Sequence, residues 1–267
     1  MTVTAGALTD GLRALGVGQG QNLLVHASLS EIGPVRGGAA AVVAALRGLL
    51  GPEGTLVAPT GTADNSDTSP LHLRAITGMS EAEIAAFRAA MPAFDPATTP
   101  STGMGKIAEC VRTSPGAVRS SHPQTSFAAL GPLADKLMND HAFDCHLGEF
   151  SPLARLYEVG GVILLLGVGY DRCTAFHLAE YRYTEKPPTR TYRCVVDFGD
   201  GPKWWQYEDV VLDDRDMALL GADFEKTGTV RHGRVGKARA RLFPMAAAVD
   251  FAMGWFARHR KPSKISS

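Results

Sequence analysis

The sequence has little cysteine, and its few cysteines are scattered. Its 267 residues include only Cys110, Cys145, Cys173 and Cys194, and no two of them form a CxxC pair. In a chain of this length such cysteines are typical of reduced thiols, so we expect a cytoplasmic protein without a disulfide framework. The first residues do not combine a basic segment with an apolar one, so no secretory signal is expected.

Long apolar runs and an excess of charge are also missing. A membrane-spanning helix needs about 20 apolar residues, whereas the longest run here covers only residues 162–168. Lys and Arg together number 27, and so do Asp and Glu. This balance does not favour a nucleic-acid partner. We therefore expect a protein that binds neither a membrane nor nucleic acid and that is a monomer or a homodimer.

The order of the predicted elements favours an α/β fold. Residues 22–26 and 55–58 are predicted as strands, and the alanine-rich residues 39–50 between them as a helix. This order predicts a buried sheet covered by helices. Further helices are expected at 7–16, 80–91, 106–112, 132–139 and 244–258, and further strands at 161–167, 192–198 and 204–211. No repeat or linker divides the chain, so residues 1–267 are expected to form one domain.

One glycine motif is rejected on its context. Residues 13–18 match the R/Q-x-x-G-x-G/A pyrophosphate loop of the common N-acetyltransferase superfamily. That loop should follow a strand and open a helix, so that its N–H groups face the phosphates. Here the segment follows a predicted helix and precedes a predicted strand. We therefore interpret Gly16 as the C-cap of the helix.

The loop between residues 26 and 38 is the better candidate for an anion site. It leaves a predicted strand, carries Ser28 and Ser30, and brings Gly37 and Gly38 to the start of a helix. Glycines let a ligand approach the backbone, and a helix N-terminus favours negative charge. An ordinary strand-to-helix connection with polar caps has the same composition, so both interpretations stay open.

His177 and an acidic run are the candidates for chemistry. His177 follows the strongest predicted strand, where α/β folds often place reactive groups. Glu208 and Asp209 begin a run of five carboxylates that ends at residue 216. A carboxylate from this run would suit a histidine that acts as general base, although a structural histidine and a solvated acidic face fit the same residues. His122, in a His-Pro turn, is a weak signal, and no HExxH zinc motif is present.

Together these segments resemble the aminoglycoside 3-N-acetyltransferase family from about residue 8 to residue 257. The resemblance rests on the order and spacing of segments at 25–30, 37–38, 54–60, 94–100, 120–123, 126–129, 151–156 and 177–181, the last reading His-Leu-Ala-Glu-Tyr. It implies a mixed central β-sheet with helices packed around it, a fold distinct from that of the common N-acetyltransferase superfamily. It also implies that acetyl-CoA donates an acetyl group to the 3-amino group of the deoxystreptamine ring of an aminoglycoside.

The resemblance implies residue roles as well. The residues expected to line the acetyl-CoA channel are His26, Ser28, Ser30, Val35, Gly37, Gly38, Ser126 and Phe127. His177 would be the base that frees the amine for direct attack on the thioester, with Glu208 or Asp209 as its acidic partner. Neither a metal nor a covalent enzyme intermediate is needed. The acids expected to bind the polycationic acceptor are Asp64, Asp67, Asp171 and Glu180.

Two features bear on the acceptor, and three alternatives stay open. Residues 146–150 depart from the small, glycine-rich residues usual in the family, and residues 63–93 are expected to shape the acceptor pocket. The first alternative is an enzyme that acylates a non-antibiotic amine in natural-product biosynthesis. The second is an amidase or acyltransferase that uses Cys110 or Cys173 as its nucleophile. The third is a protein that binds a small molecule without catalysis.

A polycationic acceptor predicts a strong effect of salt. Carboxylates around the pocket would raise the local concentration of the acceptor, and dissolved ions screen that attraction. We expect kcat/KM for an aminoglycoside to fall clearly as ionic strength rises, measured by release of the CoA thiol. A flat profile would contradict an acidic acceptor pocket.

Overall fold

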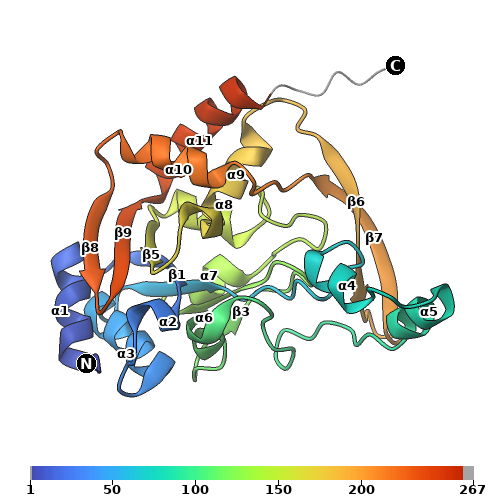
Figure 1. Ribbon diagram of the computed structural model, residues 1–267, viewed down its shortest axis with the longest axis horizontal. Coiled ribbons are helices and arrows are strands. Elements are labelled where there is room, and N and C mark those ends of the chain that lie inside the picture. The colour runs from blue at the N-terminus through green and yellow to red at the C-terminus, as the bar shows by residue number, and fades with distance from the viewer. Residues whose placement is uncertain (1, 261–267) are drawn as a thin grey trace.

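A computed structural model describes residues 2–260 (Figure 1). Its centre is a seven-stranded sheet with the strand order β3-β4-β2-β1-β5-β9-β8. The three middle strands β2 (Thr55–Pro59), β1 (Asn22–Ala27) and β5 (Val162–Leu166) are parallel, and every other neighbouring pair is antiparallel. The outer strands are β3 (Val118–Arg119), β4 (Phe127–Leu130), β9 (Ala238–Pro244) and β8 (Arg231–Val235). The predicted mixed sheet is confirmed.

Helices cover both faces of this sheet. On one face lie α1 (Ala5–Leu15), α3 (Gly38–Leu50) and α6 (Gly105–Arg112). On the other lie α7 (Ala134–Met138), α8 (Pro152–Glu158), α9 (Ala175–Arg182), α10 (Met217–Glu225) and α11 (Met245–His259). Successive strand side chains point to opposite faces, so Leu164 packs against the first group and Leu165 against the second. Because both faces of β5 are buried, its residues are apolar throughout, which explains the apolar run at residues 162–168.

A two-stranded hairpin stands apart from the main sheet. It pairs β6 (Thr189–Val196) with β7 (Lys203–Val210), and Figure 1 shows it at the opposite end of the molecule from α1, beside α4 (Pro70–Ala75) and α5 (Glu81–Ala89). A lone hairpin is only marginally stable. Here the side-chain amide of Asn65 holds it, donating to the carbonyl of Val195 at 2.9 Å and accepting from its N–H at 2.7 Å.

Most of the expected elements are present, with ends shifted by a few residues. Gly16 ends α1 with φ 109°, a left-handed C-cap, which confirms the rejection of the pyrophosphate loop. The sequence analysis did not predict α8, α9, α10, β8 or β9. β8 is an edge strand with the sequence Arg-His-Gly-Arg-Val and mostly exposed side chains, so it has no apolar run to reveal it. Within residues 2–260, no helix has the length and apolar character needed to cross a membrane.

The central strands should dominate the stability of the fold. Leu164 is fully buried in β5, where it pairs with Val25 on one side and Leu242 on the other. We expect Leu164→Ala to lower the free energy of unfolding by about 2–5 kcal/mol, the usual range for a buried leucine. Leu219→Ala on α10 is the control, because Leu219 is 59% exposed. Urea unfolding of both variants measures the difference, and equal losses would contradict this account of the core.

Candidate active site

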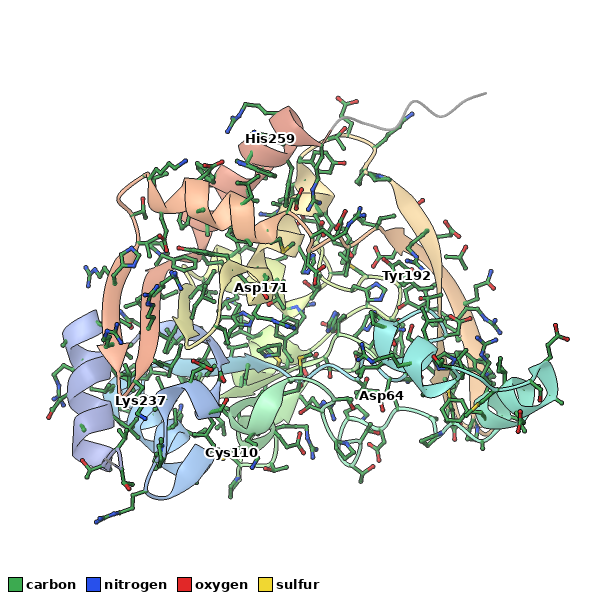
Figure 2. All side chains as sticks on the ribbon, viewed as in Figure 1. Asp64, Cys110, Asp171, Tyr192, Lys237 and His259 are labelled. Carbon is green, nitrogen blue, oxygen red and sulfur yellow. The ribbon has the colours of Figure 1, made fainter. Side chains whose placement is uncertain are left out.

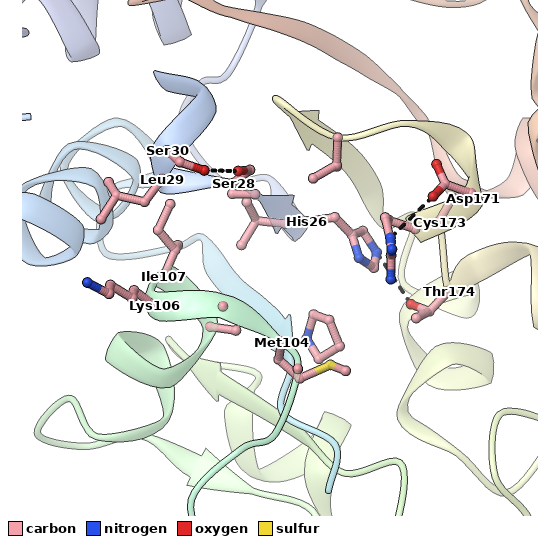
Figure 3. A pocket seen from close by; sticks show the side chains of 18 of the residues that line it. His26, Ser28, Leu29, Ser30, Met104, Lys106, Ile107, Asp171, Cys173 and Thr174 are labelled. Atoms are coloured by element: carbon pink, nitrogen blue, oxygen red, sulfur yellow. Dashed lines mark hydrogen bonds and ion pairs between the residues drawn. The ribbon is translucent and has the colours of Figure 1, made fainter. Parts of the chain in front are cut away.

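A crevice opens where the two central parallel strands end. Ala27 of β1 and Leu166 of β5 are partners in the register, and the N–H of Ser28 donates to the carbonyl of Leu166 at 2.9 Å. Beyond this point the two chains diverge, one into α2 (Leu29–Ile32) and α3, the other through η1 (Tyr170–Arg172) into α9. Such divergence at the carboxyl ends of parallel strands commonly forms a ligand crevice. A cavity of about 940 Å³ lies here (Figure 3).

His177 lies in the first turn of α9 and lines this cavity. Its Nδ1 is 2.6 Å from Oε2 of Glu180, three residues further along the helix. Residues at this spacing share one helix face, and Glu180 is 1% exposed behind the histidine. An ionised carboxylate only accepts hydrogen bonds, so the contact with Glu180 favours the His177 tautomer with the proton on Nδ1 and the lone pair on Nε2. This is the arrangement of a general base held by a carboxylate.

The carboxylate partner of His177 is therefore Glu180, not Glu208 or Asp209 as the sequence analysis expected. Glu208 is exposed on β7 and accepts from the hydroxyl of Thr191 across the hairpin. Asp209 is buried on the opposite side of the strand, 2.7 Å from Nδ1 of His146. The hairpin has its own sheet, and its side chains meet partners other than His177. Glu180 was also expected to bind the acceptor, but its side chain is buried behind His177 and does not line this cavity.

Asp209 joins the hairpin to the core. Its Oδ2 accepts from the N–H and the Nδ1 of His146, and from the hydroxyl of Tyr181 on α9, each at 2.7 Å. Burial lowers the pKa of His146, with the hydrogen bond and charge of Asp209 acting in the opposite direction. His146 belongs to the segment that departs from the usual family pattern. In this chain it is a structural residue that links its own loop to Asp209 of the hairpin and to Gln124 in the turn before β4.

His122 is also structural. It is fully buried, and its Nδ1 accepts from the N–H groups of Gln124 and Thr125 at 3.1 and 3.2 Å, which fixes the turn before β4. Burial holds the pKa of His122 well below its usual value, so the ring is neutral. Among residues 2–260, no group of three or more His, Cys, Asp or Glu side chains is placed to hold a metal ion.

His26 faces His177 from the end of β1. Its Nε2 lies 3.3 Å from the hydroxyl of Thr174, the residue before α9, and Figure 3 shows the two side chains together at the cavity wall. Burial, and then the neighbouring His177, lower the pKa of His26 to about 3. The imidazole is therefore neutral at physiological pH and adds no positive charge beside the base.

Four more residues of the proposed acetyl-CoA channel line the cavity: Ser28, Ser30, Val35 and Gly38. The two serine hydroxyls are 3.0 Å apart. Gly38 begins α3 at φ 58°, and beyond its chain neighbours and the backbone of its own helix no atom lies within 4 Å of where its Cβ would be. Gly37 does not line the cavity itself. It takes φ 84° as the N-cap of α3 and so sets the direction of that helix.

Ser126 and Phe127 are a correction, because neither lines the cavity. Both are buried on or beside β4, which pairs with β2 and β3 away from the end of β1 and β5. The hydroxyl of Ser126 donates to the carbonyl of Thr60 at 3.0 Å, and the ring of Phe127 packs in the core beneath α7 to α11. Their similarity to the family motif therefore reflects packing in this structure.

The acids expected at the acceptor pocket lie in different places. Asp171 lines the cavity, with its carboxylate 3.2 Å from Nε of Arg172. Asp64 is exposed, and Figure 2 shows it well apart from Asp171. Asp67 forms an ion pair with Arg193 of the hairpin at 3.1 Å. The structure brings neither Asp64 nor Asp67 to this cavity.

Sequence reasoning did not single out Lys106 or Thr174, which line the cavity, or place Asp214 there. Residues 106–112 were predicted as a helix, but its sequence does not show that its first turn meets the end of β1. Asp214 belongs to the acidic run of 208–216, so the sequence indicated a cluster of acids but not which of them lines the cavity. Cys173 also lines the cavity but is 1% exposed, and burial raises the pKa of its thiol to about 12. A nucleophilic thiolate at Cys173 is therefore disfavoured.

Comparison with known proteins shows the family of the chain. Residues 24–257 match the family model described as aminoglycoside 3-N-acetyltransferase. The chain belongs to this family and is an acyltransferase. It is 38% identical to the SPbeta prophage-derived aminoglycoside N(3')-acetyltransferase-like protein YokD of Bacillus subtilis, over 95% of this chain and 92% of the relative. It is 39% identical to aminoglycoside N(3)-acetyltransferase VIII of Streptomyces fradiae, over 95% and 91%.

Solved structures show the same fold. The crystal structure of YokD from Bacillus subtilis aligns with a TM-score of 0.90 at 37% identity, covering 97% of this chain and 95% of that one. AAC-IIIb in a binary complex with CoASH aligns with a TM-score of 0.83 at 30% identity, over 98% and 100%. AAC-VIa bound to sisomicin aligns with a TM-score of 0.84 at 32% identity, over 98% and 100%.

The two adjacent acids of β7 should differ sharply when neutralised. Asp209→Asn weakens hydrogen bonds to a buried carboxylate, so we expect a loss of about 1.5–3 kcal/mol in the free energy of unfolding. Glu208→Gln changes an exposed side chain and should cost less than about 0.5 kcal/mol. Chemical denaturation of both variants measures this. Equal losses would show that Asp209 does not anchor the hairpin.

Proposed function

We propose that this enzyme transfers the acetyl group of acetyl-CoA to the 3-amino group of the deoxystreptamine ring of an aminoglycoside, with His177 as general base. The observation that carries the proposal is the His177–Glu180 pair at the wall of the cavity. An ammonium group has no lone pair with which to attack a thioester, so a base must first take a proton. The free Nε2 of His177 is suited to that step.

The proposed reaction is a direct transfer. The acceptor ammonium first loses one proton to Nε2 of His177, which passes it to solvent. The neutral amine nitrogen then attacks the thioester carbonyl carbon as Nε2 takes a second proton, and the C–S bond breaks as the CoA sulfur leaves and is protonated by the imidazolium. Glu180 stabilises the imidazolium through Nδ1. The high pKa of the buried Cys173 thiol favours this route over one through an acyl-cysteine.

The crevice has the chemistry that a CoA donor needs. CoA is polyanionic, and the walls offer the hydroxyls of Ser28 and Ser30, the cation of Lys106 and the start of the 13-residue helix α3 at Gly38. A helix N-terminus with an open glycine is a favourable position for a phosphate. The AAC-IIIb complex with CoASH, at 30% identity, supports the same donor here. Because acetyl-CoA is a cytoplasmic metabolite, we place the enzyme in the cytoplasm.

An aminoglycoside is the acceptor that the relatives support, through AAC-VIa bound to sisomicin. Asp171 and Asp214 line the same cavity and would attract an ammonium-rich molecule. The alternative acceptor is a non-antibiotic amine of natural-product biosynthesis, since YokD is itself named only as an acetyltransferase-like protein. A panel of aminoglycosides and simple amines, followed by thiol release, separates the two. Turnover with amines but with no aminoglycoside would favour the alternative.

The catalytic pair gives the sharpest test of the chemistry. We expect His177→Ala to lower kcat by about 10²–10⁴, the usual contribution of a general base, while CoA still binds. Glu180→Gln should lower kcat less, because the base remains but its charged form loses a stabilising carboxylate. Steady-state kinetics and calorimetric titration with CoA measure both effects. Full activity in His177→Ala would refute the proposed base.

A further inference from the structure

Arg260, at the end of α11, reaches the carboxylate behind the proposed base. Its Nη1 donates to Oε1 of Glu180, whose other oxygen binds His177. Its Nε donates to Asp216 at 2.8 Å. Its Nη2 donates to the other carboxylate oxygen of Asp216, and to the carbonyl of Asp213 at 2.6 Å. The guanidinium carbon lies 3.7 Å above the ring of Phe256. The planar fork is thus fixed by contacts on every edge and on one face.

This arrangement solves a charge problem. A carboxylate that is 1% exposed is strongly disfavoured unless a cation and hydrogen bonds compensate for its lost water. Glu180 has one further donor from the backbone, the N–H of Asp213 at 2.9 Å. Its cationic partner is Arg260, because His177 must be neutral when it acts as a base. Burial acts to lower the pKa of Arg260, but the hydrogen bonds and charges of Asp216 and Glu180 outweigh it and raise the pKa, so the guanidinium stays charged.

We propose that Arg260 is a positioning residue for the acyl transfer, setting the proton affinity of the His177–Glu180 pair through its contact with Glu180. The proposal rests on the proposed function of His177. Two ionisable groups this close bind and release one proton as a unit. A fixed positive charge beside the pair makes the proton easier to lose, whichever member holds it. Arg260 therefore keeps the base free at lower pH than the pair alone would allow.

Other ionisable groups face the pair and must be considered with Arg260. His26 approaches His177 from β1 and is neutral. Tyr183 after α9 and Tyr192 on β6 are raised in pKa by burial and so are also neutral. The segment before α10 contributes Asp213, Asp214 and Asp216, and Arg215 pairs with Asp213 at 2.6 Å. Arg260 is the cation in direct contact with the carboxylate of the pair.

The test is the pH profile of kcat/KM for Arg260→Ala. Without the cation, the pair should hold its proton to higher pH, so the acid limb should move upward by about one pH unit or more. Above the limb, kcat should return close to the wild-type value. Arg260→Lys keeps the charge and should leave the limb near its wild-type position. A limb that stays in place in Arg260→Ala, with only the melting temperature lowered, would overturn the proposal.

Two further variants test the direction in which charge near Glu180 moves the acid limb. Asp216→Asn leaves Arg260 in place but removes a negative charge beyond it, so the acid limb should move to lower pH, by less than in Arg260→Ala. This arm still decides the question if Arg260→Ala does not fold, and an upward shift would count against the proposal. Arg258→Ala is the matched control for loss of one arginine on an exposed part of α11, and it should not move the limb. Movement of the same size in Arg258→Ala would show a general charge effect.

The space beside Arg260 allows a chemical rescue. A cavity of about 190 Å³ adjoins Arg260 and Glu180, so truncation to alanine should admit a guanidinium ion. We expect millimolar guanidinium chloride to return the acid limb of Arg260→Ala toward its wild-type position, with sodium chloride at equal ionic strength as control. Equal effects of the two salts would contradict a specific role for the guanidinium.

A measurement without turnover separates this inference from the proposed function. The ring of His177 can be titrated by NMR in the free enzyme, with its signals assigned by comparison with His177→Gln. The midpoint should rise in Arg260→Ala even if no acceptor in the panel is acetylated. That result would refute the proposed function and leave the coupling intact, whereas an unchanged midpoint would refute the coupling alone.

Discussion

The parallel pairing of β1 with β5 is the constraint on which the site depends. These strands lie side by side in the middle of the sheet, and both of their faces are buried under helices. Their carboxyl ends therefore coincide, and the two connections that leave them must turn apart. One brings His26 and the serine loop to the crevice, and the other brings His177 at the start of α9. Groups about 150 residues apart in the chain meet because two strands share a register.

Buried charge organises the surroundings of this crevice. Two carboxylates, Glu180 and Asp209, are almost wholly enclosed, and each is surrounded by donors. Asp209 receives its hydrogen bonds from His146 and Tyr181 and fastens the hairpin to α9. Glu180 receives its own from His177, the backbone and Arg260. Both carboxylates meet the Nδ1 atom of a histidine. Asp209 has a structural role because its partner, His146, is enclosed beside the hairpin, whereas Glu180 lies behind His177, which lines the cavity.

Some of the site was readable from local pattern. The His-Leu-Ala-Glu spacing places His177 and Glu180 on one face if the segment is helical. The sequence analysis did not predict α9 as a helix and searched for the carboxylate in the acidic run instead. Glu208 and Asp209 are neighbours on β7, and strand alternation leaves one exposed and buries the other. Local periodicity therefore tells which side chains of one element share a face. It identifies Glu180 as the carboxylate beside His177 only if the segment is known to be a helix.

By itself the sequence determined the buried apolar strand at 162–166, the helix ends at Gly16 and Ser80, the two strands of the hairpin, and the histidine that follows the central strand. These depend on periodicity, caps and turns, which act over a few residues. Only the tertiary structure decided that Arg260 meets Glu180, that His26 meets Thr174, and that Ser126 and Phe127 belong to the core. Those contacts depend on strand order and on which helix covers which face, and no local pattern carries that information.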